Sequence, residues 1–394
     1  MKAKRVLLGW ELGAGIGYVQ KLREIALALN EAGFEPILAL RTLELSGNML
    51  SDLPFRAIQA PYLVGRLSAE AERNGLRPTG FADLMACNGF GSEDHLYSMV
   101  RGWRDLIDII QPALVVGMYC PLLTLAAFRR IPSVLFGPPY CTPPADGDEF
   151  PSFFPDQPAF ADQTQMLVTV QQVQRRFNAP LPDRLTEIYH GDHRCITAIP
   201  EIDPYREWRS EACDGIFEVA PPLQSSRGTG FYAYLAECGD KARIVARSLL
   251  ASGLPGSIYV RDAPVDRWEL PATDCVKLLR VAPDLDTVIG SATVVVHHGG
   301  LDTTQAAIIA GKPQVLIPQV LDQWLTATAL RSLPFIVEFA NAEMSSGDIV
   351  RSVRRLHQAD DCATSALEFA SSIRDRNLHS AKQRIIDACL QLLS

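Results

Sequence analysis

Strand-like and helix-like stretches alternate along almost the whole chain, and this alternation limits the possible folds more than any other feature of the sequence. Short apolar runs at residues 5–9 and 35–40 have the character of buried strands. Residues 19–32, between them, have helical periodicity that ends at Gly33. Strands and helices in this order form a parallel sheet covered by helices on both faces. The sequence therefore predicts an α/β protein.

The chain has 394 residues, which is too long for one ordinary core. Residues 220–230, rich in Pro, Ser and Gly, are predicted to be a linker, and the alternation restarts after them. We expect one domain over residues 1–222, a second over 223–374 and a terminal helical segment over 375–394, with residues 363–393 forming one closing helix. Two doubly wound domains leave a cleft between them, where ligands usually bind.

Composition excludes several classes of function. The formal net charge is −8 and 47% of the residues are hydrophobic, so neither nucleic acid nor an anionic membrane is expected as the main partner. The longest apolar stretch, residues 114–128, contains Pro121 and is too short to span a bilayer. Nine scattered cysteines without a C-x-x-C pair favour a reducing compartment. We therefore expect a cytoplasmic protein without an integral membrane segment.

The first glycine loop follows the first predicted strand and includes Gly13, Gly15 and Gly17. Its spacing is G-x-G-x-G, whereas a dinucleotide-binding loop has G-x-G-x-x-G. The second strand, residues 37–41, also lacks the acidic residue that would hold a ribose. The loop is therefore more typical of a structural or substrate-side turn than of an NAD site.

A second turn lies in residues 294–313, VVVHHGGLDTTQAAIIAGKP, where a strand leads through two histidines and two glycines into a helix. Backbone N–H groups at such a helix start stabilise anions. His298 could add a ring donor, and Thr303 and Thr304 could add hydroxyls. The alternative is a helix that satisfies its own donors, because Asp302 followed by Gln305 fits a capping box.

Asp322 and Gln323 follow the next predicted strand. A carboxylate beside an amide can bind vicinal hydroxyl groups, as sugar recognition requires. The alternative is that Asp322 caps a helix that begins at Gln323.

Together these two motifs carry a resemblance. The run HHGGLDTTQAAIIAGKPQVLIPQVLDQWLTATAL resembles the donor region of family 1-type glycosyltransferases, whose pattern is H-x-G-x-x-[ST], a helix, G-x-P, a strand and [DE]-Q. The resemblance implies the GT-B fold, two Rossmann-like domains with the final helix crossing back to the first. It also implies a UDP- or TDP-linked sugar as donor substrate, no tightly bound cofactor and no metal.

The resemblance also assigns roles to individual residues. Residues 298–304 would contact the diphosphate, Asp322 and Gln323 the sugar, and the loop from Val281 to Pro283 the nucleobase. The full set of expected donor-site residues is Val281, His298, Gly299, Gly300, Asp302, Thr303, Thr304, Asp322 and Gln323.

Five positions depart from the family pattern. Members usually have a histidine base in the first glycine loop, where this chain has Tyr18, and an orienting aspartate near Met118. A tyrosine is a poor base at neutral pH. Asp302 would repel a diphosphate. In the base-binding loop Asp284 replaces a frequent glutamine, and Val281 a frequent tryptophan.

The candidates for the catalytic base are Tyr18, Glu11 and His95, although Glu11 could be a loop hydrogen-bonder and His95 a polar-face helix residue. We expect inverting transfer of a sugar to a small, partly apolar acceptor. Two alternatives are a GT-B scaffold used for other biosynthetic chemistry and a non-catalytic binding partner. A homodimer is a further possible assembly. Aromatic residues expected at the acceptor are Phe81, Phe90, Tyr140, Phe150, Phe153 and Phe154.

Overall fold

The computed structural model describes residues 3–13, 15–44, 47–61, 77–218, 228–236, 240–271, 273–338, 345–376 and 380–394. The chain forms two compact units. The first comprises Met1–Thr197, Tyr205–Glu218 and His379–Ser394, and the second Ala198–Pro204 and Val219–Leu378. The predicted boundary at residues 222 and 223, and most of the predicted linker, lie outside the described residues.

The first unit contains a six-stranded parallel sheet, as the alternation predicts. Its spatial order is β3-β2-β1-β4-β5-β6, so the order reverses between β1 and β4. In doubly wound folds this reversal is the switch point, where ligands bind beyond the carboxyl ends of the strands. The strands are β1 (Arg5–Trp10), β2 (Glu35–Leu40), β3 (Arg56–Gln59), β4 (Leu114–Met118), β5 (Ser133–Gly137) and β6 (His193–Ile196).

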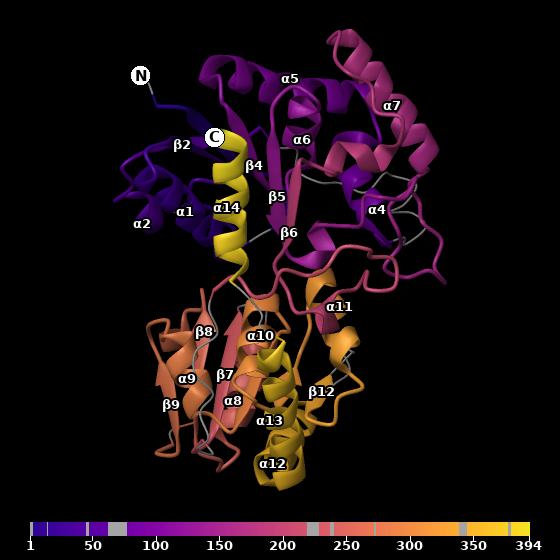
Figure 1. The fold of residues 1–394 in the computed structure, drawn as a ribbon. Helices are drawn as coiled ribbons and strands as arrows, with labels where there is room; N and C mark the ends of the chain where they lie inside the picture. The colour runs from indigo at the N-terminus through magenta and orange to yellow at the C-terminus, as the bar shows by residue number, and fades with distance from the viewer. Residues whose placement is uncertain are drawn as a thin grey trace. The chain divides into compact units, whose positions relative to one another are not determined.

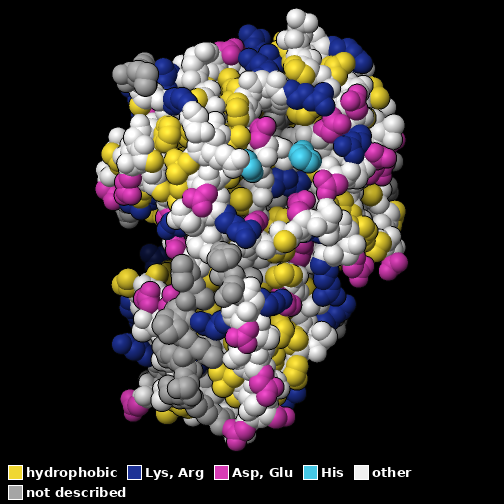
Figure 2. Space-filling view, viewed as in Figure 1, with side chains coloured by type: hydrophobic (Ala, Val, Ile, Leu, Met, Phe, Trp, Pro, Cys, Tyr) yellow, Lys and Arg dark blue, Asp and Glu magenta, His cyan; other side chains and the backbone are white. Residues whose placement is uncertain are grey.

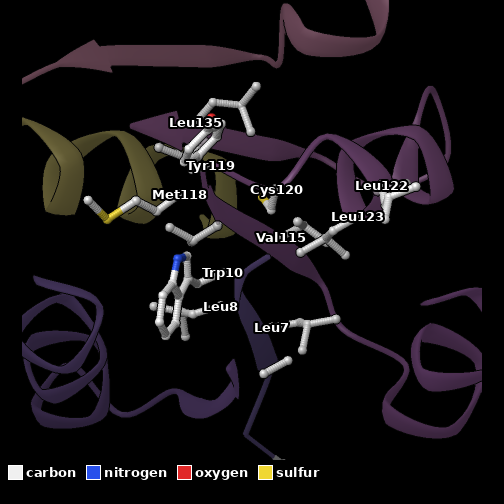
Figure 3. Packing of buried hydrophobic residues seen from close by; sticks show 14 of the residues in the cluster. Leu7, Leu8, Trp10, Val115, Met118, Tyr119, Cys120, Leu122, Leu123 and Leu135 are labelled. Carbon is white, nitrogen blue, oxygen red and sulfur yellow. The ribbon is translucent and has the colours of Figure 1, made fainter. Parts of the chain in front are cut away.

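Both faces of this sheet are covered, which explains why its central strands are apolar without interruption. Figure 3 shows Trp10 and Met118 on one side of β1 and β4, and Leu7, Val115 and Leu123 on the other. All five side chains are almost wholly buried. The covering helices are α1 (Ile16–Glu31), α2 (Gly47–Leu50), α4 (Phe81–Met85), α5 (Glu93–Ile110), α6 (Pro121–Ala127), α7 (Gln163–Arg176) and α14 (Ala381–Leu393).

The last helix of the chain, α14, belongs to the first unit. It packs against α1 and against β4, β5 and β6, and Figure 1 shows it in yellow beside these indigo and purple elements. Ile385 and Cys389 are fully buried on its inner face. The chain thus returns to its first unit after completing the second.

The second unit repeats the same topology. Its six parallel strands have the order β12-β11-β10-β7-β8-β9, so the switch point lies between β10 and β7. The strands are β7 (Phe231–Ala236), β8 (Gly256–Arg261), β9 (Val276–Leu279), β10 (Val294–His297), β11 (Gln314–Leu316) and β12 (Ile336–Glu338). The helices are α8 (Asp240–Leu250), α9 (Leu285–Ser291), α10 (Leu301–Ile309), α11 (Leu321–Leu330), α12 (Ser346–Gln358) and α13 (Asp360–Asp375).

Two predicted helices were wrong in detail. Helical periodicity in the sequence predicts a helix over residues 183–190, but this segment contains only a short 3-10 helix, Leu185–Tyr189. The closing helix over residues 363–393 is instead two helices, α13 and α14. The side chain of Ser380 accepts a hydrogen bond from the backbone N–H of Gln383, which starts a new helix at Ala381. The short strands β3 and β12 and the helix α4 were not predicted.

Charged side chains of both signs are mixed on the face of the molecule that Figure 2 shows. On the face drawn in Figure 2, Lys and Arg are interspersed with Asp and Glu rather than gathered in a field of one sign. Among the helices of the described residues, none combines the length and the apolar character needed to cross a membrane.

The packing of α14 gives a first testable prediction. Ile385→Ala should lower the free energy of unfolding by about 2–4 kcal/mol, because the deleted atoms leave a cavity under the first sheet. The measurement is denaturant unfolding followed by tryptophan fluorescence. The exposed Gln391→Ala, on the same helix, is the matched control and should change stability little. Equal stability of the two variants would show that α14 does not stabilise the first unit.

Candidate functional site

His297, the last residue of β10, organises the turn at the switch point of the second sheet. Its side chain is fully buried, and burial lowers its pKa to about 4, so the ring is neutral at physiological pH. Nδ1 accepts the N–H of Gly299 at 3.1 Å. Nε2 therefore carries the proton and donates it to Oε1 of Gln314 on β11, at 2.8 Å. The neutral ring fixes the start of the glycine turn.

His298 joins three strand ends at the same edge of the sheet. Its Nε2 accepts the backbone N–H of Ala236, at the end of β7, at 2.8 Å. Its Nδ1 donates to the carbonyl of Ile317, just beyond β11, at 2.9 Å. Burial lowers its pKa, so the ring stays neutral. With both nitrogens engaged, His298 has no ring N–H for a phosphate, which contradicts the donor role expected from the sequence.

The two glycines that follow have different tasks. Gly299 has φ 83°, and a Cβ there would lie 3.1 Å from the carbonyl oxygen of Gln323, so a side chain is excluded by both conformation and space. The turn therefore packs directly on the start of α11. At Gly300 no atom of the described residues lies within 4 Å of the position that a Cβ would take. This glycine leaves the approach to the next helix open.

Helix α10 begins at Leu301, and its first internal hydrogen bond runs from the N–H of Thr304 to the carbonyl of Gly300, at 3.0 Å. The N–H groups of Leu301, Asp302 and Thr303 come before that bond, so the helix itself gives them no acceptor. The positive end of the helix dipole of α10 thus lies just after Gly300. Such an arrangement stabilises an anion.

The capping box suggested by Asp302 and Gln305 does not form. The N-cap is Gly300, which has no side chain, so Asp302 lies within the first turn rather than before it. It is exposed. Gln305 is buried, and its Oε1 accepts the N–H of Ile199 at 3.0 Å. The hydroxyl of Thr304 donates back to the carbonyl of Gly300 and is also committed to the helix.

Asp322 and Gln323 lie in the first turn of α11, directly against the glycine turn. The N-cap of α11 is Val320, so the alternative in which Asp322 caps a helix starting at Gln323 is wrong. The side chain of Gln323 contributes to capping instead, because its Oε1 accepts the N–H of Gln319, just before the helix, at 2.8 Å. Its amide nitrogen carries two further hydrogen-bond donors. Burial raises the pKa of Asp322.

The predicted nucleobase loop lies between β9 and α9. Val281 is exposed there, at 79% of its surface. Asp284 is the N-cap of α9, and its Oδ2 accepts the N–H of Thr287 at 2.9 Å. A capping task thus accounts for the aspartate at this position.

Three residues near the turn were missed by the sequence reasoning: Tyr234, Tyr259 and Arg261. Tyr234 on β7 stacks on Tyr259 of β8, with ring centroids 6.0 Å apart and planes at 10°. Arg261, the last residue of β8, donates through Nη1 to the hydroxyl of Tyr234 at 3.0 Å. The signal was the alternation of these positions along FYAYLA and SIYVR, which puts them on one face of the sheet.

At the switch point of the first sheet, Glu11 follows β1 and is fully buried. Its two oxygens accept the N–H groups of Leu122, at 2.9 Å, and Leu123, at 2.6 Å, in the first turn of α6. Burial raises its pKa to about 8, although these two hydrogen bonds lower it. The protein's own carboxyl group thus fills the helix start that faces this switch point.

Tyr18 lies in the first turn of α1 and is almost buried. Its ring stacks on Trp10 at 5.3 Å, and its hydroxyl hydrogen-bonds to that of Tyr140. Gly13 has φ 79°, and a Cβ there would lie 2.6 Å from the hydroxyl of Tyr18, so the first glycine loop makes room for the phenol. The packing of Tyr18 is thus a structural reason for a glycine at position 13.

The three candidate bases do not form one cluster. Glu11 is buried against α6, Tyr18 is bonded to Tyr140, and His95 lies exposed in the first turn of α5. Met118, at the position expected for an orienting aspartate, is buried in the core (Figure 3). Among the aromatics expected at the acceptor, Phe81 is a core residue that contacts the rings of other buried aromatics: Tyr119, Phe150 and Tyr189.

Sequence comparisons cover parts of the chain. Residues 267–391 match the family model described as erythromycin biosynthesis protein CIII-like, C-terminal domain. An uncharacterised glycosyltransferase of Mycobacterium tuberculosis is 27% identical over 181 residues, 46% of this chain and 42% of the relative. The elloramycin glycosyltransferase of Streptomyces olivaceus is 44% identical over 108 residues, 27% of this chain and 25% of the relative. The chain thus spans less than half the length of these curated relatives.

Solved structures match over nearly the full length. The calicheamicin glycosyltransferase CalG4 has a TM-score of 0.70 at 15% identity, covering 100% of this chain and 99% of the other. The glycosyltransferase VinC, solved in complex with DTDP, has a TM-score of 0.67 at 15% identity, covering 98% and 99%. The chain therefore has the GT-B fold of bacterial natural-product glycosyltransferases, and its residues 267–391 match the C-terminal domain of the erythromycin biosynthesis protein CIII-like family.

Proposed function

We propose that this protein transfers a sugar, with inversion, from a nucleoside-diphosphate donor to a small and partly apolar acceptor. One observation carries the proposal: the open turn at Gly300 presents the first N–H groups of α10 directly beside the first turn of α11, which holds Asp322 and Gln323. An anion cradle next to a carboxylate and an amide has the chemistry needed for a sugar diphosphate.

The comparisons support the nature of both substrates. VinC is described in complex with DTDP, and the spinosyn rhamnosyltransferase SpnG in complex with spinosyn aglycone. The latter has a TM-score of 0.63 at 14% identity. We therefore propose a TDP- or UDP-linked sugar as donor and an aglycone of a natural product as acceptor, in the cytoplasm.

In the proposed reaction the acceptor oxygen bonds to the anomeric carbon as the bond from that carbon to the diphosphate oxygen breaks. Negative charge develops on the leaving diphosphate, and the N–H groups of Leu301, Asp302 and Thr303 stabilise it. Asp322 and the amide of Gln323 hold sugar hydroxyls and orient the anomeric carbon. The proton of the acceptor hydroxyl passes to solvent water, so the products are the glycoside, the nucleoside diphosphate and one proton.

The fate of that proton distinguishes the three candidate bases. A carboxyl group with a pKa near 8 is protonated at neutral pH, so Glu11 cannot accept a proton there, and we propose that it is structural. His95 lies at an exposed surface. The hydroxyl of Tyr18 can orient an acceptor oxygen. An acidic acceptor hydroxyl loses its proton readily and would not need a strong general base.

The alternative function is a GT-B scaffold that binds without transferring. The observation in its favour is the replacement of the usual histidine and aspartate by Tyr18 and Met118. Nucleotide binding and turnover separate the two functions.

The donor site is tested by isothermal titration with UDP, TDP and GDP. At least one should bind in the micromolar range, and His298→Ala should weaken binding by about tenfold because the turn loses its ties to β7 and β11. Asp302→Asn should strengthen binding by about fivefold by removing a like charge. Asp361→Asn, in the first turn of α13, is the matched control. If none of the three nucleotides binds the wild type, the proposed function is wrong.

The structural role of Glu11 predicts a pH dependence of stability. Its pKa is raised from 4.5 to about 8, so the folded protein keeps a proton that the unfolded chain releases between these values. The contribution of Glu11 therefore makes the free energy of unfolding fall as pH rises, by about 2–3 kcal/mol between pH 5 and 7. Glu11→Gln should lack this component, as denaturant titrations at several pH values would reveal.

The exposed Glu31→Gln is the control for Glu11 and should keep the pH profile of the wild type. With a working donor and acceptor, Glu11→Gln should also retain turnover within about threefold at pH 7, since the amide resembles the protonated carboxyl. A fall in kcat of a hundredfold or more (general-base loss) would contradict the structural role.

Tyr18→Phe removes only the hydroxyl and should lower kcat about tenfold while leaving donor affinity unchanged, because the phenol acts on the acceptor side. His95→Gln is the comparison and should leave kcat as it is. Steady-state turnover with titration of both substrates measures this. Unchanged kcat in both variants would mean that the acceptor hydroxyl is activated without either side chain.

A further inference from the structure

The turn before α10 lacks a positive side chain of its own. His298 is neutral, and both its ring nitrogens bond to the backbone of Ala236 and Ile317. Asp302, in the first turn of α10, is exposed and adds a negative charge. A nucleoside diphosphate brings two or more further negative charges to this turn. Backbone dipoles alone would have to balance them unless a cation lies close by.

Arg261 is placed at this edge of the sheet by strand register. It is the last residue of β8 and pairs with Ala236, the last residue of β7. The N–H of Ala236 in turn bonds to the ring of His298. The charge of Arg261 is close enough to lower the pKa of His298, in addition to the larger effect of burial. Arg261 therefore lies at the same edge of the sheet as the ring that begins the glycine turn.

The guanidinium group of Arg261 is held in place by a neighbouring tyrosine and is partly exposed to solvent. Nη1 donates to the hydroxyl of Tyr234 at 3.0 Å, and Tyr234 is stacked on Tyr259. Asp262, at φ 59°, turns the chain sharply after the strand, and its Oδ2 lies 3.2 Å from Nε of Arg261. Asp262 is 82% exposed, so this ion pair is in contact with water and contributes little. The side chain of Arg261 is itself 41% exposed and can reach an incoming ligand.

We propose that Arg261 binds the diphosphate of the nucleotide donor and supplies the positive charge that the turn before α10 lacks, with Tyr234 as its positioning residue. The inference rests on the proposed function, since it assumes that a nucleoside diphosphate binds at this turn. A planar guanidinium with several N–H donors suits a diphosphate better than a point charge does. Arg261 thus makes the site select for the diphosphate over the monophosphate.

The test is isothermal titration of the full chain with TDP and TMP. Arg261→Gln should weaken the binding of TDP by about tenfold or more and the binding of TMP much less, so the ratio of the two affinities falls. Arg261→Lys should recover part of that ratio, because lysine keeps the positive charge but lacks the planar set of N–H donors of a guanidinium group. Tyr234→Phe should lower the ratio by about threefold by freeing the guanidinium. A variant that only disturbs the fold would weaken both nucleotides alike.

Arg247→Gln removes the same charge from the exposed last turn of α8 and is the matched control, for which both affinities should equal those of the wild type. The salt dependence of TDP binding should also become shallower in Arg261→Gln and not in the control. If the wild type binds TDP and Arg261→Gln binds both nucleotides as the wild type does, the inference is wrong while the proposed function stands. If the wild type binds no nucleoside diphosphate, both are wrong.

Discussion

The ring of His298 is the interaction on which the candidate donor site depends. It accepts from β7 and donates to the chain beyond β11, so one neutral imidazole ties three neighbouring strand ends together across the switch point of the second sheet. A buried ring with both nitrogens paired has one tautomer and one orientation. The glycine turn that follows can therefore keep an open conformation, because the residue before it is fixed on both sides.

The first sheet has the same topology and uses its switch point differently. There the helix start after β4 is occupied by the buried carboxyl group of Glu11, whereas the helix start after β10 is left open by Gly300. A helix start whose N–H groups are already paired with a carboxyl group cannot bind an anion, so the two halves of this repeated architecture are not equivalent. One helix start is closed by the protein's own side chain, and the other is where we propose that the donor binds.

Much of the fold followed from the sequence. Apolar runs separated by helical periodicity predicted both parallel sheets, because strands covered on both faces must be apolar throughout. The first residues of the helices were harder to predict from the sequence. Both α10 and α11 begin two residues earlier than their acidic residues suggest, with Gly300 and Val320 as N-caps. Local patterns assign capping to acidic side chains, but α10 starts at a glycine without a side-chain cap, and at α11 the side chain that bonds to the backbone before the helix is that of Gln323.

The sequence predicted which elements lie next to each other at the candidate site, but not how their side chains pair, and the role of the site stays a prediction. The order of strand, two glycines and helix located the turn, and the short distance in sequence to Asp322 and Gln323 located its neighbour. The pairing of His298 could not be predicted, because its partners lie 62 and 19 residues away in the chain. Arg261 could not be placed at the site for the same reason, since only the register of β7 and β8 brings it to the edge of the sheet where His298 lies.

Gly299 has a consequence for how donor specificity can change. Its missing side chain lets the turn before α10 rest on the backbone of α11, so the separation between the start of α10 and the residues Asp322 and Gln323 is set by main-chain packing. Substitutions of the side chains of Asp322 or Gln323 leave that separation as it is. Under the proposed function, sugar specificity can therefore change through single side-chain substitutions, while the position of the leaving diphosphate stays fixed.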